Sequence, residues 1–399
     1  MLQAINDNGE KVTLALLSKD DIQYQKENHN FFCPVCNEAL IVKAGTKMIA
    51  HFSHQSNTSC PSHYGGEGEY HERGKLDLYQ WLKEQRINVS LEHYIPKIKQ
   101  RPDLFIKIGN KQIAMEYQCA RMSSKEFLER NSGYRRLDIT PIWILGGNRM
   151  KRSKSSSLLL SSNDLLYVHQ FSSGFPLTMY FYCPNSHYFA IYQHVQTTGT
   201  KQTIGSIVFH KLRTLRIRDL FHHLPINPSF YSLWKNKIFH VRTKPRQHIS
   251  NQEKSWIQWL YLQRVHPTLL PSICFIPVSS QWMMRTAIWI WQSKIVIGLL
   301  RYNRSFTLQL CKNLLSDQMN SSHTFPLIQG QKNPIMEYLD ILENLKIIVR
   351  TNAESYRVMK LIQIPKNIDL ANQQDDQLIQ QLRYSLYPDL THDSSIDTI

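Results

Sequence analysis

The stretch RPDLFIKIGNKQIAMEYQ, residues 101–118, decides the fold that the sequence predicts. Two apolar runs flank Gly109-Asn110, and both of these residues tolerate the positive φ angles of a tight hairpin turn. Counting six or seven positions away from this turn reaches Asp103 on one side and Glu116 on the other. We therefore expect these two carboxylates at the same end of a β-hairpin.

A pair of carboxylates on adjacent strands is suited to Mg²⁺, which keeps several waters and takes few protein ligands. Side chains two apart on a strand share a face, so Gln118 should point the same way as Glu116. A Mg²⁺ in this position can clamp a phosphodiester and activate a water, which points towards nucleic acid hydrolysis. Short motifs like these also occur by chance, and the alternative is a hairpin with no metal.

The hairpin lies within a compact α/β pattern between residues 65 and 150. Ser123 and Glu126 form a capping box, which predicts the start of the second helix. The expected elements, in order, are a helix over 67–85, strands over 89–95, 103–108 and 112–119, a helix over 123–137 and a strand over 140–145. This order is αβββαβ.

The first of these helices carries three functional groups on one stripe. Glu67, His71 and Lys75 are spaced four residues apart, so they face one direction. The stripe could face the hairpin, or it could be a solvated helix face. Glu69 and Glu72 are rival acids, and the spacing does not choose among the three.

A metal-binding pattern precedes the helix. Cys33-Pro-Val-Cys36 is followed by His51-Phe-Ser-His54, and a Cys₂His₂ set of this kind binds Zn²⁺ tetrahedrally. Cys60 and His63 follow closely, and either could replace one of the histidines. The alternative is two structural cysteines near unrelated histidines. We expect a structural zinc ion that stabilises a small zinc-finger-like module.

The charge of the chain indicates a polyanionic partner. The 399 residues carry a formal charge of +16, and residues 151–250 hold 13 Lys or Arg against Asp164 and Asp219. This quarter fits a DNA track, with Phe230, Tyr231 and Trp234 stacking on unpaired bases. The alternatives are a solvated basic surface and aromatic rings that pack in a core.

Composition also predicts the remaining organisation. We expect domains at 1–64 (zinc-finger-like), 65–150 (nuclease-like), 151–251 (basic, opening on a serine-rich linker), 252–364 (mainly helical) and 365–399 (a mobile acidic tail). The most apolar stretch, 282–300, contains Arg285 and Lys294, so a buried element is expected rather than a membrane span. The first residues lack the features of a signal peptide, and the seven cysteines suit a reducing cytoplasm.

Several of these motifs together resemble the competence protein CoiA family, over roughly residues 1–150. They are Cys33-Pro-Val-Cys36, His51-Phe-Ser-His54, Glu67 with His71 and Gly74-Lys75, Arg101-Pro102-Asp103, Glu116-Tyr117-Gln118-Cys119 and Ile142-Trp143-Ile144-Leu145. The resemblance implies a PD-(D/E)xK nuclease-like core behind the zinc-finger-like module. It also implies a role with DNA taken up in natural transformation, near recombination proteins such as RecA.

Carried over residue by residue, the resemblance implies that Asp103 and Glu116 bind Mg²⁺ or Mn²⁺. Gln118 stands where the nuclease motif usually has Lys, and it cannot supply positive charge, so Lys75 could supply it instead. Glu67 or Glu69 would complete the metal's surroundings, and His71 could move a proton near neutral pH. The competing hypotheses are a non-catalytic DNA-binding recombination mediator that keeps the nuclease fold, and a protein-interaction scaffold.

Overall fold

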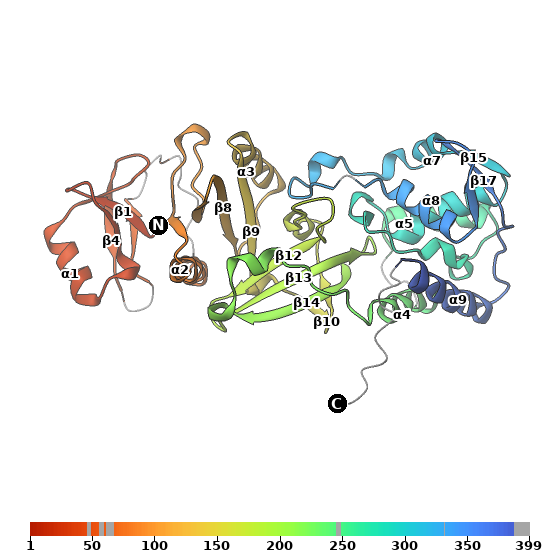
Figure 1. The fold of residues 1–399 in the computed structure, drawn as a ribbon, viewed down its shortest axis with the longest axis horizontal. Helices are drawn as coiled ribbons and strands as arrows, with labels where there is room; N and C mark the ends of the chain where they lie inside the picture. Colours follow the sequence, from red (N-terminus) through yellow and green to blue (C-terminus); the bar gives the residue numbers. More distant parts are fainter. Residues whose placement is uncertain (46–48, 56–59, 61–67, 245–248, 331, 387–399) are drawn as a thin grey trace, which may run out of the picture.

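The computed structural model describes residues 1–45, 49–55, 60, 68–244, 249–330 and 332–386. Three parts follow one another along the long axis of the molecule (Figure 1): an N-terminal module, a central sheet with its helices, and a mainly helical C-terminal part. The α/β fold class predicted from the sequence is confirmed.

The N-terminal module is a small antiparallel sheet beside one helix. Its strand order is β2 (Lys11–Thr13), β1 (Gln3–Asn6), β3 (Phe31–Phe32), β4 (Ala39–Lys43) and β5 (His51–His54). Helix α1 (Lys19–Asn28) begins at Ser18, whose side chain accepts a hydrogen bond from the Asp21 N–H. The core of the module is small, with Leu14, Phe31 and Phe52 at its centre.

The central part is built on a nine-stranded sheet. In spatial order its strands are β10 (Arg152–Lys154), β11 (Ser157–Leu159), β14 (Gln202–Lys211), β13 (Tyr188–Thr197), β12 (Thr178–Cys183), β9 (Ile139–Gly146), β8 (Lys111–Gln118), β7 (Leu104–Ile108) and β6 (Asn88–Leu91). β9 runs parallel to both β8 and β12, and the other neighbours are antiparallel.

Helices α2 (Glu69–Glu84) and α3 (Ser124–Arg136) cover opposite faces of this sheet. Leu78 and Trp81 of α2 pack with Met115 and Tyr117, whereas Phe127 of α3 packs in a second cluster on the other face. Neighbouring residues of β8 therefore face different helices. The sheet thus places an odd-numbered β8 residue beside α2 and an even-numbered one beside α3.

The sheet continues across residue 150, where the sequence predicted a domain boundary. The basic, serine-rich run expected to be a linker forms the hairpin β10–β11, and β11 pairs with β14. Leu158 and Leu160 are buried against the sheet, which explains why this run is held in place. The αβββαβ order is present, but it forms only one side of a larger sheet.

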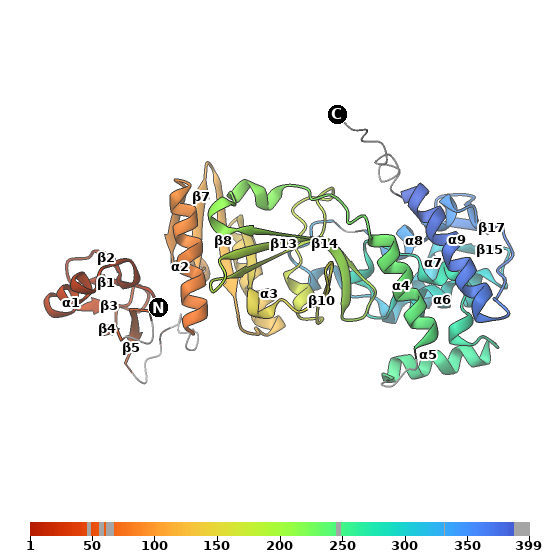
Figure 2. The ribbon, with the colours of Figure 1, turned by 90° about the horizontal axis from the view of Figure 1, so that it is seen from below.

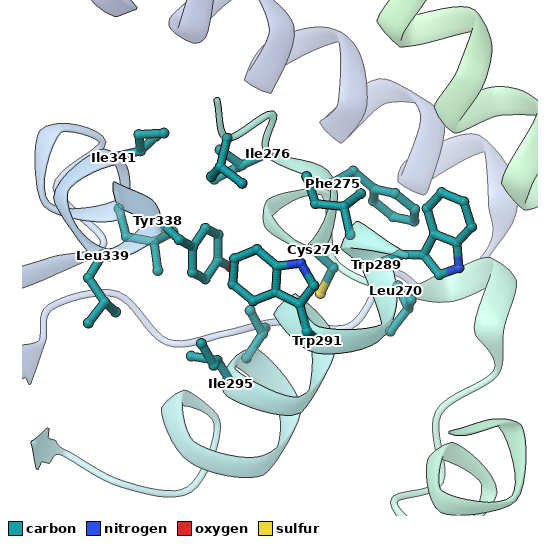
Figure 3. Close-up of a cluster of buried hydrophobic side chains, with 14 of the residues drawn as sticks. Leu270, Cys274, Phe275, Ile276, Trp289, Trp291, Ile295, Tyr338, Leu339 and Ile341 are labelled. Atoms are coloured by element: carbon teal, nitrogen blue, oxygen red, sulfur yellow. The ribbon is translucent and has the colours of Figure 1, made fainter. Parts of the chain in front are cut away.

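The C-terminal part is mainly helical, as expected. Its helices are α4 (Phe230–Thr243), α5 (Asn251–Leu262), α6 (Ile288–Ile295), α7 (Leu308–Leu314), α8 (Pro334–Asn344) and α9 (Ile368–Leu386), beside a small sheet of β15 (Ser305–Thr307), β17 (Ser355–Val358) and β16 (Ile348–Arg350). Trp291 and Tyr338 meet edge to face in its core (Figure 3). None of the helices in the described ranges is long and apolar enough to span a membrane. The apolar stretch 282–300 contains α6, which is buried in the core.

Two expectations for this region are corrected by the structure. Phe230, Tyr231 and Trp234 are buried in the C-terminal core, so they are not available to stack on bases. Residues 368–386, expected to belong to a mobile tail, form α9, because Ala371, Leu378 and Leu382 make a buried apolar stripe. The rest of that tail, 387–399, lies outside the described residues.

Candidate functional site

The two predicted carboxylates lie at the same end of the β7–β8 hairpin. Leu104 pairs with Met115, so Asp103 comes directly before β7 and Glu116 is the next position on β8. Gly109 at the turn has a φ of 55°, as the hairpin sequence predicts. Asp103 accepts a hydrogen bond through Oδ2 from the Tyr117 N–H, at 2.8 Å, which fixes its carboxylate at the end of β8.

On the α2 side, one buried lysine lies among three carboxylates. The Nζ of Lys75 is 2.6 Å from Glu92 Oε1, 3.4 Å from Glu72 Oε2 and 3.8 Å from Asp103 Oδ1. The Lys75 side chain is 0% exposed, so its ammonium is removed from water and depends on these acids. We call Lys75 with these three carboxylates the Lys75 network.

Glu92 connects this network to the N-terminal module. Its Oε2 accepts hydrogen bonds from the backbone N–H groups of Leu2, at 3.0 Å, and Gln3, at 3.4 Å. Arg101 Nη1 lies 3.8 Å from the same oxygen. Glu92 adopts a φ of 47°, a conformation that non-glycine residues rarely take. The sequence analysis missed Glu92, because its loop carries no motif.

His71 lies next to the same end of the hairpin. Its Nε2 is 2.6 Å from the Tyr117 carbonyl oxygen and 3.6 Å from Asp103 Oδ2. The ring stacks on that of Tyr117, with the two planes 11° apart. The stripe predicted for α2 therefore does face the hairpin at His71 and Lys75.

On the α3 side, Glu116 is bound by residues that the sequence analysis did not find. Arg130 Nε donates to Glu116 Oε1 at 3.1 Å, and Arg130 Nη2 and the Tyr134 hydroxyl donate to the same oxygen. Burial raises the pKa of Glu116, Arg130 opposes this rise, and the charge of Asp103 adds to it. The only available signal was the i, i+4 spacing of Arg130 and Tyr134 on a predicted helix.

Other predicted site residues lie elsewhere or are not described. Gln118 donates through Nε2 to the Ala120 carbonyl oxygen at 3.0 Å, and among the described residues it makes no hydrogen bond to either carboxylate. Glu67 lies outside the described residues. Glu69 is exposed at the start of α2, and Glu72, one turn further on, is the described helix acid that reaches the Lys75 network.

The donor set at the hairpin fits a divalent ion held by few protein ligands. Four buried or nearly buried carboxylates gather here, from Glu72, Glu92, Asp103 and Glu116, together with the basic side chains of Lys75, Arg101 and Arg130. Within the described part of the chain, these acids do not converge as a group of three ligands around one point. Asp103 and Glu116 with waters would be a sufficient set for Mg²⁺.

The described residues do contain one convergent ligand group. Atoms of Cys33, Cys36, His54 and Cys60 all lie within 4.8 Å of one another. The Cys33 and Cys60 sulfurs are 3.9 Å apart, and Cys36 Sγ is 3.3 Å from His54 Nε2. Three thiols and one imidazole make a donor set of the kind that suggests zinc.

His51, predicted as the fourth ligand, is not in this group, and Cys60 takes that place. The Nδ1 of His51 instead bonds with the Ile49 carbonyl oxygen at 2.8 Å. His51 and His54 both belong to strand β5, and residues three apart on a strand point to opposite faces. The alternative ligand His63 lies outside the described residues.

Comparison with known proteins gives three consecutive matches along the chain. Residues 14–63 match the N-terminal domain, residues 67–225 the nuclease-like domain and residues 230–371 the C-terminal domain of competence protein CoiA. The chain is also 31% identical over 346 residues to "Competence protein CoiA" of Bacillus subtilis (strain 168), covering 84% of this chain and 91% of that protein. This chain belongs to the competence protein CoiA family. No solved structure matches it.

The CoiA family domains agree with the observed architecture. The match to the nuclease-like domain spans α2, α3 and the whole nine-stranded sheet, which ends with β14. The match to the C-terminal domain begins at the first residue of α4. The Lys75 network and Glu116 therefore lie within the nuclease-like domain of this CoiA family member.

Proposed function

We propose that this protein hydrolyses DNA phosphodiester bonds at the Asp103–Glu116 end of the hairpin, in a reaction that depends on Mg²⁺ or Mn²⁺. The observation that supports the proposal is that both carboxylates directly follow the last β7–β8 pair, Leu104 with Met115, at one end of the hairpin in a nuclease-like domain. The activity would serve the processing of DNA taken up in natural transformation, in support of recombination.

The residues have distinct roles in this proposal. Asp103 and Glu116 hold the divalent ion, which when bound would polarise the scissile phosphate and a hydrolytic water. Lys75, 3.8 Å from Asp103, supplies the positive charge that Gln118 cannot. His71 lies 3.6 Å from Asp103 and can hold or move a proton beside it. Gln118 is the least supported member, because its amide bonds with Ala120.

A second candidate is a non-catalytic DNA-binding mediator of recombination that keeps the nuclease fold. A specific observation favours it: Glu116 is already bound by Arg130 and Tyr134, and Asp103 lies beside Lys75. In this reading the internal cations take the place of a metal. DNA would then be held but not cut.

A cleavage assay separates the two candidates. Labelled single-stranded, duplex and branched DNA are incubated with Mg²⁺ or Mn²⁺ and the wild-type protein, Asp103→Asn or Glu116→Gln. Loss of a single metal ligand should reduce cleavage by about 100-fold or more, since one preorganised electrostatic contact is worth that much. Glu129→Gln is the matched control, because Glu129 is a 65% exposed acid on α3.

The outcomes of this assay are distinct. Cleavage that is lost in both variants and kept in Glu129→Gln supports the nuclease. If the wild-type protein binds DNA but cuts none of the substrates with either metal, the mediator is the correct reading. Binding that is weak and insensitive to salt would instead support a protein-interaction scaffold.

We also propose a structural zinc ion at Cys33, Cys36, His54 and Cys60. The module that they would staple has a small core, so the ion should contribute much of its stability. Metal analysis of the purified protein tests this, and a folded sample without zinc would contradict it. The cysteine composition supports a cytoplasmic location. The family resemblance implies contact with RecA, and a pull-down with purified RecA would test the contact.

A further inference from the structure

A stripe of basic residues lies along one face of α4, away from the hairpin site. Lys237, His240 and Lys244 are spaced three and four residues apart, so they share one face at the end of the helix. Figure 2 shows α4 where the central sheet meets the rest of the C-terminal part. This stripe therefore lies at the junction of the nuclease-like and C-terminal domains.

A β-bulge adds a fourth basic residue from the edge of the sheet. Arg152 pairs with Leu158, but Lys154 pairs with Ser157, so the register shifts between the two basic residues. Ser157 pairs with Ile204, which packs in the same core as α4. The bulge thus directs Lys154 to the α4 side of the sheet, whereas Arg152 stacks over the ring of Phe209 on the other side.

Lys237 is a half-buried cation with neutral partners. Its Nζ lies 3.4 Å from Thr200 Oγ1 and 3.3 Å from Gln202 Oε1. Burial, and after it the charge of Lys244, lower the pKa of this ammonium. Among the described residues, no carboxylate lies within salt-bridge distance of Lys237, so its burial is not offset by an acid.

The other basic residues of α4 behave differently. Arg242 and Lys235 form ion pairs with Asp375 and Asp376 of α9, on another face of the helix. Within the described ranges, Lys154 and Lys244 form no such pair, and both are exposed. The nearby acids therefore neutralise one side of α4 and leave the other side positive.

The field of this surface is visible in His240. Partial burial, and then the charges of Lys244, Lys154 and Lys237, lower the pKa of its ring. This direction agrees with the spacing on α4 and with the register of the bulge, which place the three lysines on the side of His240. Phe239 beside it is 48% exposed and offers an aromatic ring at the rim of the same surface.

We propose that Lys154, Lys237, His240 and Lys244 form a surface that binds the phosphate backbone of DNA across the domain junction. A polyanion would supply the counter-charge that Lys237 lacks, and each lysine could contact one phosphate. The inference rests on the proposed function only in taking DNA as the ligand. It adds a binding surface separate from the hairpin end where hydrolysis is proposed.

Binding titrations with lysine variants test this surface. Fluorescently labelled single-stranded and duplex oligonucleotides are titrated with the full-length protein at several salt concentrations, without added Mg²⁺ or Mn²⁺. The variants are Lys154→Gln and the double variant Lys237→Gln/Lys244→Gln. Lys312→Gln on α7 is the control, because it removes one positive charge, as Lys154→Gln does, at another place in the protein.

The double variant should bind on the order of tenfold more weakly, and its log–log salt slope should fall by about one for each lysine removed. Lys154→Gln should show a smaller loss of the same kind, and Lys312→Gln should match the wild type. A loss of affinity for both oligonucleotides indicates recognition of the phosphate backbone that they share. A loss of affinity for one of them identifies the strand form that this surface prefers. Unchanged affinity and slope in a double variant with wild-type circular dichroism would overturn the proposal.

The result is independent of the cleavage assay. If the lysine variants bind weakly while Asp103→Asn binds normally without cutting, both proposals stand. If the lysine variants bind like the wild type but cleavage still requires Asp103, only the surface proposed here is wrong. If no variant changes binding and nothing is cleaved, both are wrong.

Discussion

Two buried groups of charges, one in each of the larger domains, differ in how completely they are balanced. In the C-terminal domain, Arg242 donates to both oxygens of Asp375, each at 2.7 Å, and to the carbonyls of Thr268 and Leu270 at 2.8 and 2.9 Å. Ser272 donates to the same carboxylate at 2.6 Å. The charges of Arg242 and Asp375 therefore balance each other, and neutral groups make the remaining hydrogen bonds.

The Lys75 network in the nuclease-like domain is not balanced in this way. Glu72, Glu92 and Asp103 surround the ammonium of Lys75, and Arg101 lies 3.8 Å from Glu92. Buried carboxylates in excess of their cations cost stability, and groups of this kind are often found at functional sites. A complete pair thus indicates a structural role, while an over-acidic network at the end of neighbouring strands indicates a site for a cation or a reaction.

Breaking the complete pair should have the largest effect on stability. Arg242→Met leaves Asp375 buried without its partner, so the free energy of unfolding should fall by about 3–5 kcal/mol. Urea unfolding of the variant measures this change. The double variant Arg242→Met/Asp375→Leu should recover most of the loss, because no charge remains buried. A loss of DNA cleavage in the folded double variant would contradict a purely structural role for the pair.

Removing the central cation of the over-acidic network should have a somewhat smaller and metal-dependent effect. Lys75→Met removes the ammonium that lies among Glu72, Glu92 and Asp103, so the free energy of unfolding should fall by roughly 3 kcal/mol. Mn²⁺ or Ca²⁺ should then raise its Tm more than that of the wild type, because the freed carboxylates can bind the ion. Arg242→Met is the control. Equal responses to the ion in both variants would remove the distinction between the two groups.

His169 tests a third way of burying a titratable group, in neutral form. Its Nε2 accepts from the Trp143 N–H at 3.0 Å, and burial lowers its pKa to about 3. The imidazole therefore stays neutral in the folded state, whereas in the unfolded chain it binds a proton near pH 6.5. The stability that this residue contributes is present above that pH and is lost as the pH falls. Between pH 7 and pH 5 the free energy of unfolding should fall by about 2 kcal/mol because of this residue. Urea unfolding midpoints of the wild type and His169→Gln at both pH values would measure this change. The free energy of unfolding of the variant should fall by that much less.

An exposed ion pair should have the smallest effect. Lys125 and Glu129 lie 4.0 Å apart on α3, with side chains 86% and 65% exposed. Lys125→Ala should change the free energy of unfolding by less than about 0.5 kcal/mol, and high salt should change it little further. A larger loss would show that burial is not what separates the strong pairs of this protein from the weak ones.

The sequence predicts those features that local chemistry determines. The Gly109-Asn110 turn sets the hairpin register, and the caps at Ser18, Ser123 and Asn333 begin α1, α3 and α8. The spacing put His71 and Lys75 on one helix stripe but left open which way the stripe faces, and in the structure it faces the hairpin. The metal module was predicted, with one ligand exchanged.

The sequence could not predict contacts that depend on tertiary packing. Glu92 is fixed by the N-terminal strand, and Asp375 pairs with an arginine 133 residues away. Choosing Glu72 over Glu69 requires knowing which face of α2 is buried. Gly74 is also explained only by packing, because a Cβ there would lie 2.1 Å from the Tyr117 ring, so glycine permits the close packing of α2 on β8.

The pairing of β9 with β12 has a practical consequence for dissecting this protein into pieces. Ile144 and Leu145 are hydrogen-bonded neighbours of Tyr180 and Phe181, so cleavage of the chain at residue 150 would divide a single sheet. Each fragment would then present a bare, apolar strand edge and tend to aggregate. Inactivity of a fragment 1–150 would accordingly reveal misfolding, not the absence of catalysis. A cut between β14 and α4 would keep the nuclease-like sheet whole.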